Sequence, residues 1–276
     1  MTHWQGKLNL TYAKQAGATQ IIHALNHAPL KVQRPFYPEG KQICHTVALH
    51  TAGGIVGGDR LTQSLHLQPN SEVFFTTPAA SKIYRSNGQQ AQQQIEINLK
   101  ENTILEWFPQ ESIIFNGADY RQKMRVNLAP NAVFLGWEIT RFGRTARGEQ
   151  FVSGEWRSHN EIWQQDTPLW IDRQWLPGNP ETVQSPHALA NYPIVASFIA
   201  LGLPHADTLL EKARELYPTP PKTGEFGLTP TQQQGLLCRY RGTSLTEIKQ
   251  RFITLWHFLR QHSLSRQKIS PRIWFG

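Results

Sequence analysis

The fold is decided by residues 95–108, which read Ile-Glu-Ile-Asn-Leu-Lys-Glu-Asn-Thr-Ile-Leu-Glu-Trp-Phe. Apolar and polar residues alternate up to Leu99, a polar turn follows over Lys100–Asn102, and a second β-prone run begins at Ile104. Alternation with a period of two is typical of a strand that buries one face. The stretch therefore predicts two strands joined by a short turn.

The same turn pattern, Leu-x-x-Asn, occurs at Leu67–Asn70, Leu99–Asn102 and Leu128–Asn131. Each copy is followed by an apolar run, and the copies begin 32 and 29 residues apart (67 to 99, 99 to 128). A period of this size is typical of stacked β-coils, in which each coil buries its apolar face against the next. Three imperfect copies fit ordinary hairpin turns equally well, so the sequence leaves both arrangements open.

The C-terminal third has a different pattern. Ala206–Tyr217 predicts a helix, and the Pro-, Thr- and Gly-rich segment Pro218–Pro230 predicts a loop. A second helix is predicted from Ser244 to Ser263, because Ser244 and Glu247 have the spacing of a capping box. Its apolar residues fall on one face, which favours core packing over an exposed partner-binding surface; they are Leu245, Ile248, Phe252, Leu255, Trp256 and Leu259.

These patterns predict a single, mainly β domain over residues 1–276. We expect a stacked or helical arrangement of short strands over about residues 1–180, and a helix-containing part with two α-helices over about residues 200–276. Besides the runs quoted above, strands are predicted at Val73–Thr77, Ile113–Phe115, Val133–Ile139 and Leu169–Leu176.

Composition restricts the class of protein. Of 276 residues, 28 are Lys or Arg and 20 are Asp or Glu, giving a net charge of +8. The basic residues are scattered, which favours an acidic protein partner over nucleic acid. Cys44 and Cys238 are the only cysteines, too few for a disulfide framework. No stretch has the length and apolarity of a membrane span, and the N-terminus lacks the pattern of a signal peptide, so we expect a cytoplasmic protein.

A glycine-rich stretch, His50-Thr-Ala-Gly-Gly-Ile-Val-Gly-Gly-Asp59, is the sharpest local motif. Its glycines predict a backbone with positive φ angles or close approach to neighbouring segments. It is not a nucleotide-binding loop, because no Lys-Ser/Thr pair follows the last glycine and the spacing differs from Gly-x-Gly-x-x-Gly.

With this motif the sequence resembles the UreD (UreH) family of urease accessory proteins. The resemblance extends nearly from end to end, although that family usually has two prolines where Thr51 and Ala52 stand. The segments that carry it are Val32–Pro38, Gly53–Asp59, Thr76–Ser86, Leu105–Ala118, Gly143–Phe151 and Pro271–Trp274.

The resemblance implies a non-catalytic scaffold of mainly β, helically stacked fold. It implies a complex with a UreF-like accessory protein and a UreG-like GTPase on the urease apoprotein, through which nickel(II) passes without a tightly bound cofactor. Phe252, Trp256 and Trp274 are then the residues we expect to form or support the docking surface for the UreF-like partner. The alternative is a β-helical enzyme that acts on a small polar substrate, but no Gly-x-Ser-x-Gly, His-Glu-x-x-His or Cys-x-x-Cys motif supports it.

If nickel passes through this subunit, it needs nitrogen, oxygen or thiolate ligands. Asp59, Glu138 and Asp172 are candidates, because each is a carboxylate in or beside a run of strand residues. Cys44 and His50 are further candidates, placed by alternation on one face of a strand, with His45 on the other. For each of these residues a structural role is the competing interpretation. Asp59 would cap the turn, and Glu138 and Asp172 would be paired or face the solvent. Cys44 would be a buried thiol, and His50 a hydrogen-bonded imidazole.

Two further pairs of charged residues have a structural role as one of their interpretations. Glu106 and Glu111, which flank Trp107–Gln110, are expected on the surface or in a structural role. Arg144 and Glu149 lie in a glycine-rich stretch and are expected to brace a loop or to contact a partner.

Overall fold

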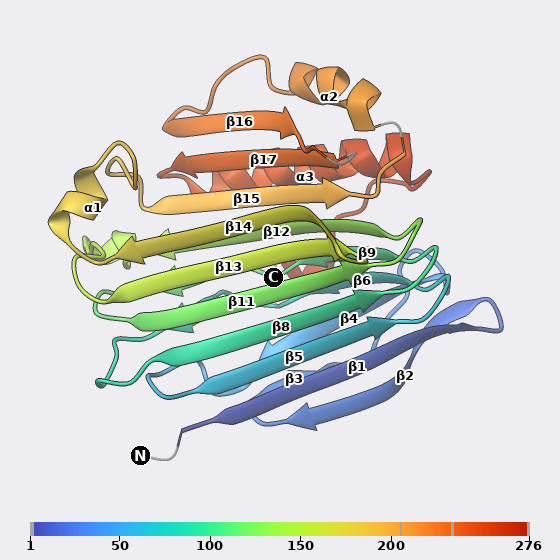
Figure 1. The fold of residues 1–276 in the computed structure, drawn as a ribbon, viewed down its shortest axis with the longest axis horizontal. Coiled ribbons are helices and arrows are strands. Elements are labelled where there is room, and N and C mark those ends of the chain that lie inside the picture. The colour runs from blue at the N-terminus through green and yellow to red at the C-terminus, as the bar shows by residue number, and fades with distance from the viewer. Residues whose placement is uncertain (1–2, 205, 233–234, 275–276) are drawn as a thin grey trace.

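The computed structural model describes residues 3–204, 206–232 and 235–274. Within these residues the chain forms two stacked β-sheets with helices against one of them (Figure 1). The seven-stranded sheet has the order β14 (Thr167–Pro177), β13 (Glu155–Gln164), β11 (Asp119–Leu128), β8 (Ala91–Leu99), β5 (Arg60–Leu67), β1 (Gln5–Gln15) and β2 (Ala18–His27). The ten-stranded sheet has the order β16 (Gly224–Pro230), β17 (Gly235–Gly242), β15 (Ile194–Leu201), β12 (Val133–Phe142), β9 (Ile104–Phe108), β6 (Glu72–Thr76), β4 (Ile43–His50) and β3 (Leu30–Val32), with β7 (Ser81–Ile83) and β10 (Ser112–Ile114) beside the end of β12.

The centre of the molecule is a stack of β-coils, as one of the two interpretations of the repeat predicted. Each coil runs from a strand of one sheet through a Leu-x-x-Asn turn into a strand of the other, and equivalent strands pair in parallel. Asn70, Asn102 and Asn131 all have left-handed backbones, with φ of 63°, 56° and 61°. Asn tolerates this conformation better than most residues, which explains why it recurs at this position. The amide of Asn102 donates to the side-chain oxygen of Asn70 (3.4 Å), so the turns also stack on one another.

The alternation of each strand places one set of side chains between the sheets. In β5, for example, Leu61, Leu65 and Leu67 point inward and are almost fully buried. In β4 the predicted alternation is confirmed: Cys44 belongs to the core between the sheets, whereas His45 stacks on Phe74 at the opposite face. The inter-sheet core is apolar toward both ends of the coils, but polar side chains interrupt it in the middle, where the candidate site lies.

The outer face of the ten-stranded sheet is covered by helices. Helix α3 (Leu245–Ser263) begins at the predicted cap, where the Ser244 hydroxyl accepts a hydrogen bond from the Glu247 backbone N–H (3.2 Å). α2 (Ala206–Glu215) lies beside β16 and β17, and the short helix α1 (Pro180–Gln184) was not predicted. None of the helices among the described residues is both long and apolar enough to cross a membrane.

Two of the three predicted partner-binding residues lie in the core. Phe252 and Trp256 are fully buried against the sheet, so the interpretation of this stripe as core packing is correct and neither side chain can meet a partner directly. Trp274 is half-buried and packs on Phe74, Trp137 and Trp256, and its indole N–H donates to the Thr76 hydroxyl (2.9 Å). The C-terminal tail is therefore packed against the body of the protein.

Two expectations from the sequence need correction. The segment predicted as a loop over Pro218–Pro230 contains β16, and β15 and β17 extend the sheet well beyond residue 180. For Glu106, the structural alternative of the expectation is the one that holds, because it is fully buried and forms ion pairs with Arg260 (3.1 Å) and Arg266 (2.9 Å). The expected brace between Arg144 and Glu149 is present, with the Arg144 Nε 2.8 Å from a Glu149 oxygen.

Candidate functional site

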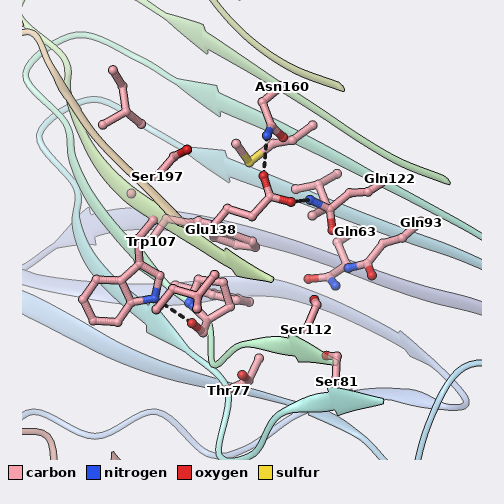
Figure 2. Close-up of a pocket in the computed structure, with 18 of the residues that line it drawn as sticks. Gln63, Thr77, Ser81, Gln93, Trp107, Ser112, Gln122, Glu138, Asn160 and Ser197 are labelled. Atoms are coloured by element: carbon pink, nitrogen blue, oxygen red, sulfur yellow. Dashed lines mark hydrogen bonds between the residues drawn. The ribbon is translucent and has the colours of Figure 1, made fainter. Parts of the chain in front are cut away.

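A polar cavity lies between the two sheets, in the middle of the stacked coils. Its volume is about 80 Å³, which has room for a few water molecules. Figure 2 shows that its polar side chains converge from both sheets. Those of the seven-stranded sheet are Gln63 on β5, Gln93 on β8, Gln122 on β11 and Asn160 on β13, and those facing them include Thr77, Ser81, Ser112, Glu138 and Ser197.

Glu138 is the carboxylate of this cavity. It points inward from β12 and accepts hydrogen bonds from Gln122 (2.9 Å), Ser158 (2.9 Å) and Asn160, all of which come from the opposite sheet. Burial raises the pKa of Glu138 above its ordinary value, and the hydrogen bonds from Asn160 and Ser158 act in the opposite direction. No Lys, Arg or His among the described residues forms an ion pair with Glu138, and Arg239 acts on it only at longer range. A cation entering the cavity would stabilise its ionised form.

Asp172 and Arg239 lie near the edge of the same inter-sheet space. Asp172 points inward from β14, and Arg239 reaches it from β17 with two contacts, of 2.9 and 3.1 Å. The same guanidinium donates to Ser197 (3.2 Å), which lines the cavity. Asp172 is buried, whereas 41% of the Arg239 side chain is exposed, so this ion pair connects the polar interior with the surface.

A second cavity adjoins the first. Its volume is about 450 Å³, and it shares Gln63, Thr77, Ser81 and Gln93 with the first cavity, so the two cavities adjoin. Polar and apolar side chains line both of them, and we call the two cavities together the passage. His50 lines the outer part of the second cavity, together with Gly53, Gly54 and Lys82. Neither ring nitrogen of His50 has a hydrogen-bond partner among the described residues. Burial lowers the pKa of His50, partly opposed by the charge of Asp59, and the neutral imidazole that results is the form that binds metals.

The structure separates Asp59 and Cys44 from this passage. Asp59 closes the glycine turn: its two oxygens accept the backbone N–H groups of Trp4 (2.9 Å) and Val56 (3.0 Å), and its side chain is fully buried. This is the geometry of the turn-capping alternative. Cys44 lies in the apolar core beside Tyr12 and Thr46, where burial raises the pKa of its thiol. Neither residue lines either cavity.

The glycines of the turn have the predicted backbone roles. Gly58 has a φ of 93°, which disfavours any residue with a Cβ. At Gly57 a Cβ would lie 2.6 Å from the Gln89 carbonyl oxygen, so the two segments approach too closely for a side chain. The turn thus fixes the position of Asp59 relative to the end of β4, which carries His50.

The passage offers successive single ligands and not one closed site. Among the described residues no group of three His, Cys, Asp or Glu side chains could hold a metal ion together. His50 lines the second cavity and Glu138 the first, with the shared glutamines between them. Asp172 lines neither cavity and is linked to the first only through Arg239 and Ser197. Oxygen and imidazole ligands of this kind suit a divalent transition metal. Their role as ligands remains a prediction.

Several residues of the passage were not predicted from the sequence. Gln63, Gln93 and Gln122 each occupy an inward-facing position of a strand whose other inward positions are mostly apolar. A polar residue at the apolar phase of an alternating strand was the available signal. Arg239 had no such signal, because β17 was not predicted.

Comparisons with known proteins agree with the resemblance seen in the sequence. The family model described as "UreD urease accessory protein" matches residues 5–275. A Nostoc sp. (strain PCC 7120) protein named "Urease accessory protein UreD" is 59% identical over 271 residues, which make up 98% of this chain and 96% of that protein. Proteins with the same name are 57% identical in Trichormus variabilis, over 98% of this chain and 96% of theirs, and 44% identical in Thermosynechococcus vestitus, over 99% of both chains. All three are named as accessory proteins and not as enzymes. This chain belongs to the UreD family of urease accessory proteins.

Proposed function

We propose that this chain supports urease maturation as a non-catalytic subunit, and that nickel(II) moves toward the urease apoprotein through the passage between its two sheets. The observation that carries the proposal is a series of polar side chains in the two adjoining cavities, from His50 through the shared Gln63 and Gln93 to Glu138. Asp172 is linked to this series through Arg239 and Ser197. An apolar core would fill this space with packed side chains. A polar space with a carboxylate that lacks a cationic contact lowers the cost of bringing in a divalent cation.

The proposal includes the partners that the family resemblance implies. The chain would act in the cytoplasm in a complex with a UreF-like accessory protein and a UreG-like GTPase, bound to the urease apoprotein. Nickel would be the cargo, with no tightly bound cofactor. Ligands that act one at a time fit this role, because a transported ion must leave each position as readily as it enters.

Substitution of the passage carboxylates tests the proposal. We expect Glu138→Ala and Asp172→Ala to leave the yield of the complex unchanged and to lower the nickel content of the urease several-fold. Glu138→Gln and Asp172→Asn retain the shape and one oxygen, so their effects should be smaller. The measurement is paired: complex yield by pull-down, and nickel per urease active site by elemental analysis.

Two controls define the comparison. Glu101→Gln removes an exposed carboxylate from a turn outside the passage and should change neither quantity. Asp59→Ala removes the acceptor of two backbone N–H groups, so complex yield and nickel content should fall together. Normal nickel loading in both Glu138→Ala and Asp172→Ala would refute the passage and leave the family assignment standing.

A further inference from the structure

The outward face of β11, β13 and β14 differs from the rest of its sheet. No helix covers this sheet, whereas α3 covers the other one (Figure 1). The outward side chains of β5 and β8 are mostly uncharged, such as Thr62, Ser64 and Gln94. On the three strands nearest the β14 edge they are instead cationic and aromatic. We call the outward-facing side chains of β11, β13 and β14, from Arg121 on β11 to Trp175 on β14, the basic face.

The cations of the basic face lie in cross-strand rows. One row consists of Arg121 on β11, Arg157 on β13 and Trp175 on β14. The next row consists of Lys123 on β11, His159 on β13 and Arg173 on β14. Like charges opposite each other on adjacent strands destabilise a sheet. Glu155 and Glu161 offset part of this cost by pairing with Arg157 (2.7 Å) and Arg173 (3.2 Å).

The central cations remain uncompensated. Among the described residues neither Arg121 nor Lys123 has a carboxylate within 4.0 Å, the limit for an ion pair. Next to them, burial together with the charges of Arg121, Arg173 and Lys123 lowers the pKa of His159. Arg121 still acts on Glu155, whose pKa it helps to lower. Among the described residues, however, the centre of the face holds its positive charges without a direct ion pair.

Two tryptophans flank this centre, the exposed Trp175 and the half-buried Trp163. The Arg157 guanidinium lies 5.1 Å from the ring centre of Trp175, and that of Arg125 lies 4.8 Å from the ring centre of Trp163. Trp175 is 60% exposed, the largest value among the exposed large apolar side chains of the described residues. Trp and Arg are the residues most enriched at binding hot spots, and the stacking holds both in place before a partner arrives.

The charge pattern favours a protein over a nucleic acid. Glu155 and Glu161 lie on the same face and would repel a phosphate backbone that crosses it. Separate carboxylates on a protein surface can instead meet Arg121 and Lys123 individually. A hollow of about 450 Å³ lies on this face and is lined by Lys123, Arg125, His159 and Arg173 together with the carboxylates Glu96 and Glu161. Its cations outnumber its carboxylates.

We propose that the basic face docks a carboxylate-bearing surface of the urease apoprotein. This inference rests on the proposed function, because the function names that partner. The position of the face supports it: on β14, Asp172 points inward to the passage while Arg173 and Trp175, its neighbours in the chain, point outward. A protein seated on the basic face would therefore lie beside the Asp172–Arg239 end of the passage.

Binding of purified urease apoprotein to the full-length chain, co-purified with its UreF-like partner, tests the inference. Lys123→Glu reverses a central charge, and Trp175→Ala removes the exposed ring. We expect each to weaken binding at least about tenfold, which corresponds to about 1.4 kcal/mol. Lys100→Glu makes the same charge change in an exposed turn away from the face and should bind normally. Raising the salt concentration should weaken the unsubstituted chain more than Lys123→Glu.

The outcomes separate this inference from the proposed function. Unchanged binding by both Lys123→Glu and Trp175→Ala would overturn the docking face, while the nickel content of the Glu138 and Asp172 variants would still decide the passage. Binding of single-stranded RNA at 150 mM salt that is lost in both variants would also overturn it, because the occupant would then be a nucleic acid. Loss of urease binding in both variants, with normal binding by Lys100→Glu, supports it.

Discussion

The side chain of Glu106 joins elements that are far apart in the sequence. One of its oxygens lies 3.1 Å from Arg260 Nε and accepts the Trp256 indole N–H (2.7 Å), and the other lies 2.9 Å from Arg266. Glu106 and Arg260 are both fully buried. Removing one member of a buried ion pair is far more costly than losing a surface pair. Arg260 and Arg266 would keep Glu39 and Glu72 as partners, which places the expected loss at the lower end of the range for buried pairs.

We therefore expect Glu106→Gln to lower the free energy of unfolding by about 3 kcal/mol. Urea denaturation followed by tryptophan fluorescence measures this change. The matched control is Glu211→Gln, which breaks an ion pair with Arg214 on the exposed side of α2 and should have little effect. A loss for Glu106→Gln no larger than that of the control would show that α3 is held by its apolar contacts alone.

At the scale of the element, the Leu-x-x-Asn turns connect the two sheets. Asn102 has a φ of 56° and hydrogen-bonds to Asn70 in the neighbouring coil. A left-handed backbone costs a residue such as Ala roughly 1–2 kcal/mol, whereas glycine adopts it freely. Asn102 thus contributes to the free energy of unfolding through its backbone conformation as well as through its side-chain hydrogen bond.

Asn102→Ala is expected to lower the free energy of unfolding by about 1 kcal/mol. Asn102→Gly should lose less, because it retains the backbone conformation and gives up only the side-chain hydrogen bond. Lys100→Ala, in the same turn, should be close to neutral. Denaturation of the three variants side by side gives the comparison, and equal losses for Ala and Gly at position 102 would contradict the role assigned to the backbone.

The molecule as a whole exposes large apolar side chains on several sides. They include Trp175, Trp4, Ile22 and Phe36, each more than 40% exposed. Single exposed apolar side chains are common on folded proteins. That the chain needs partners is therefore expected mainly from its membership of a family of accessory proteins. The C-terminal tail is part of the same body. It follows α3 in the chain, and Trp274 packs against the apolar core between α3 and the ten-stranded sheet.

We expect the chain alone to associate or precipitate, and co-expression with the UreF-like partner to give a soluble complex. Size-exclusion chromatography with light scattering distinguishes these states. A chain truncated after Ser270 should keep its β-sheet circular dichroism but bind the partner less well. A stable monomer that never associates with the partner, or a truncated chain that binds it normally, would contradict this expectation.

Much of the fold was predictable from local patterns. Alternation located most strands of the coils, and Ser244 with Glu247 located the start of α3. The recurring Leu-x-x-Asn turn gave stacked coils as one of two open arrangements, and the structure shows that one. These features act over a few residues, because strand period, left-handed turns and helix caps are properties of the local backbone. The family, too, was evident in the order of the motifs along the chain.

The site was decided by tertiary structure. Alternation shows that Glu138 and Gln122 each face one side of a strand, but only the stacking of the two sheets brings them to 2.9 Å from each other. The same applies to Glu106, which meets Arg260 across 154 positions (106 to 260) of the chain. The sequence by itself determined the strands, the turns and the family. Which side chains lie opposite one another depends on how whole sheets and helices pack, since burial and charge pairing are properties of contacts between distant segments.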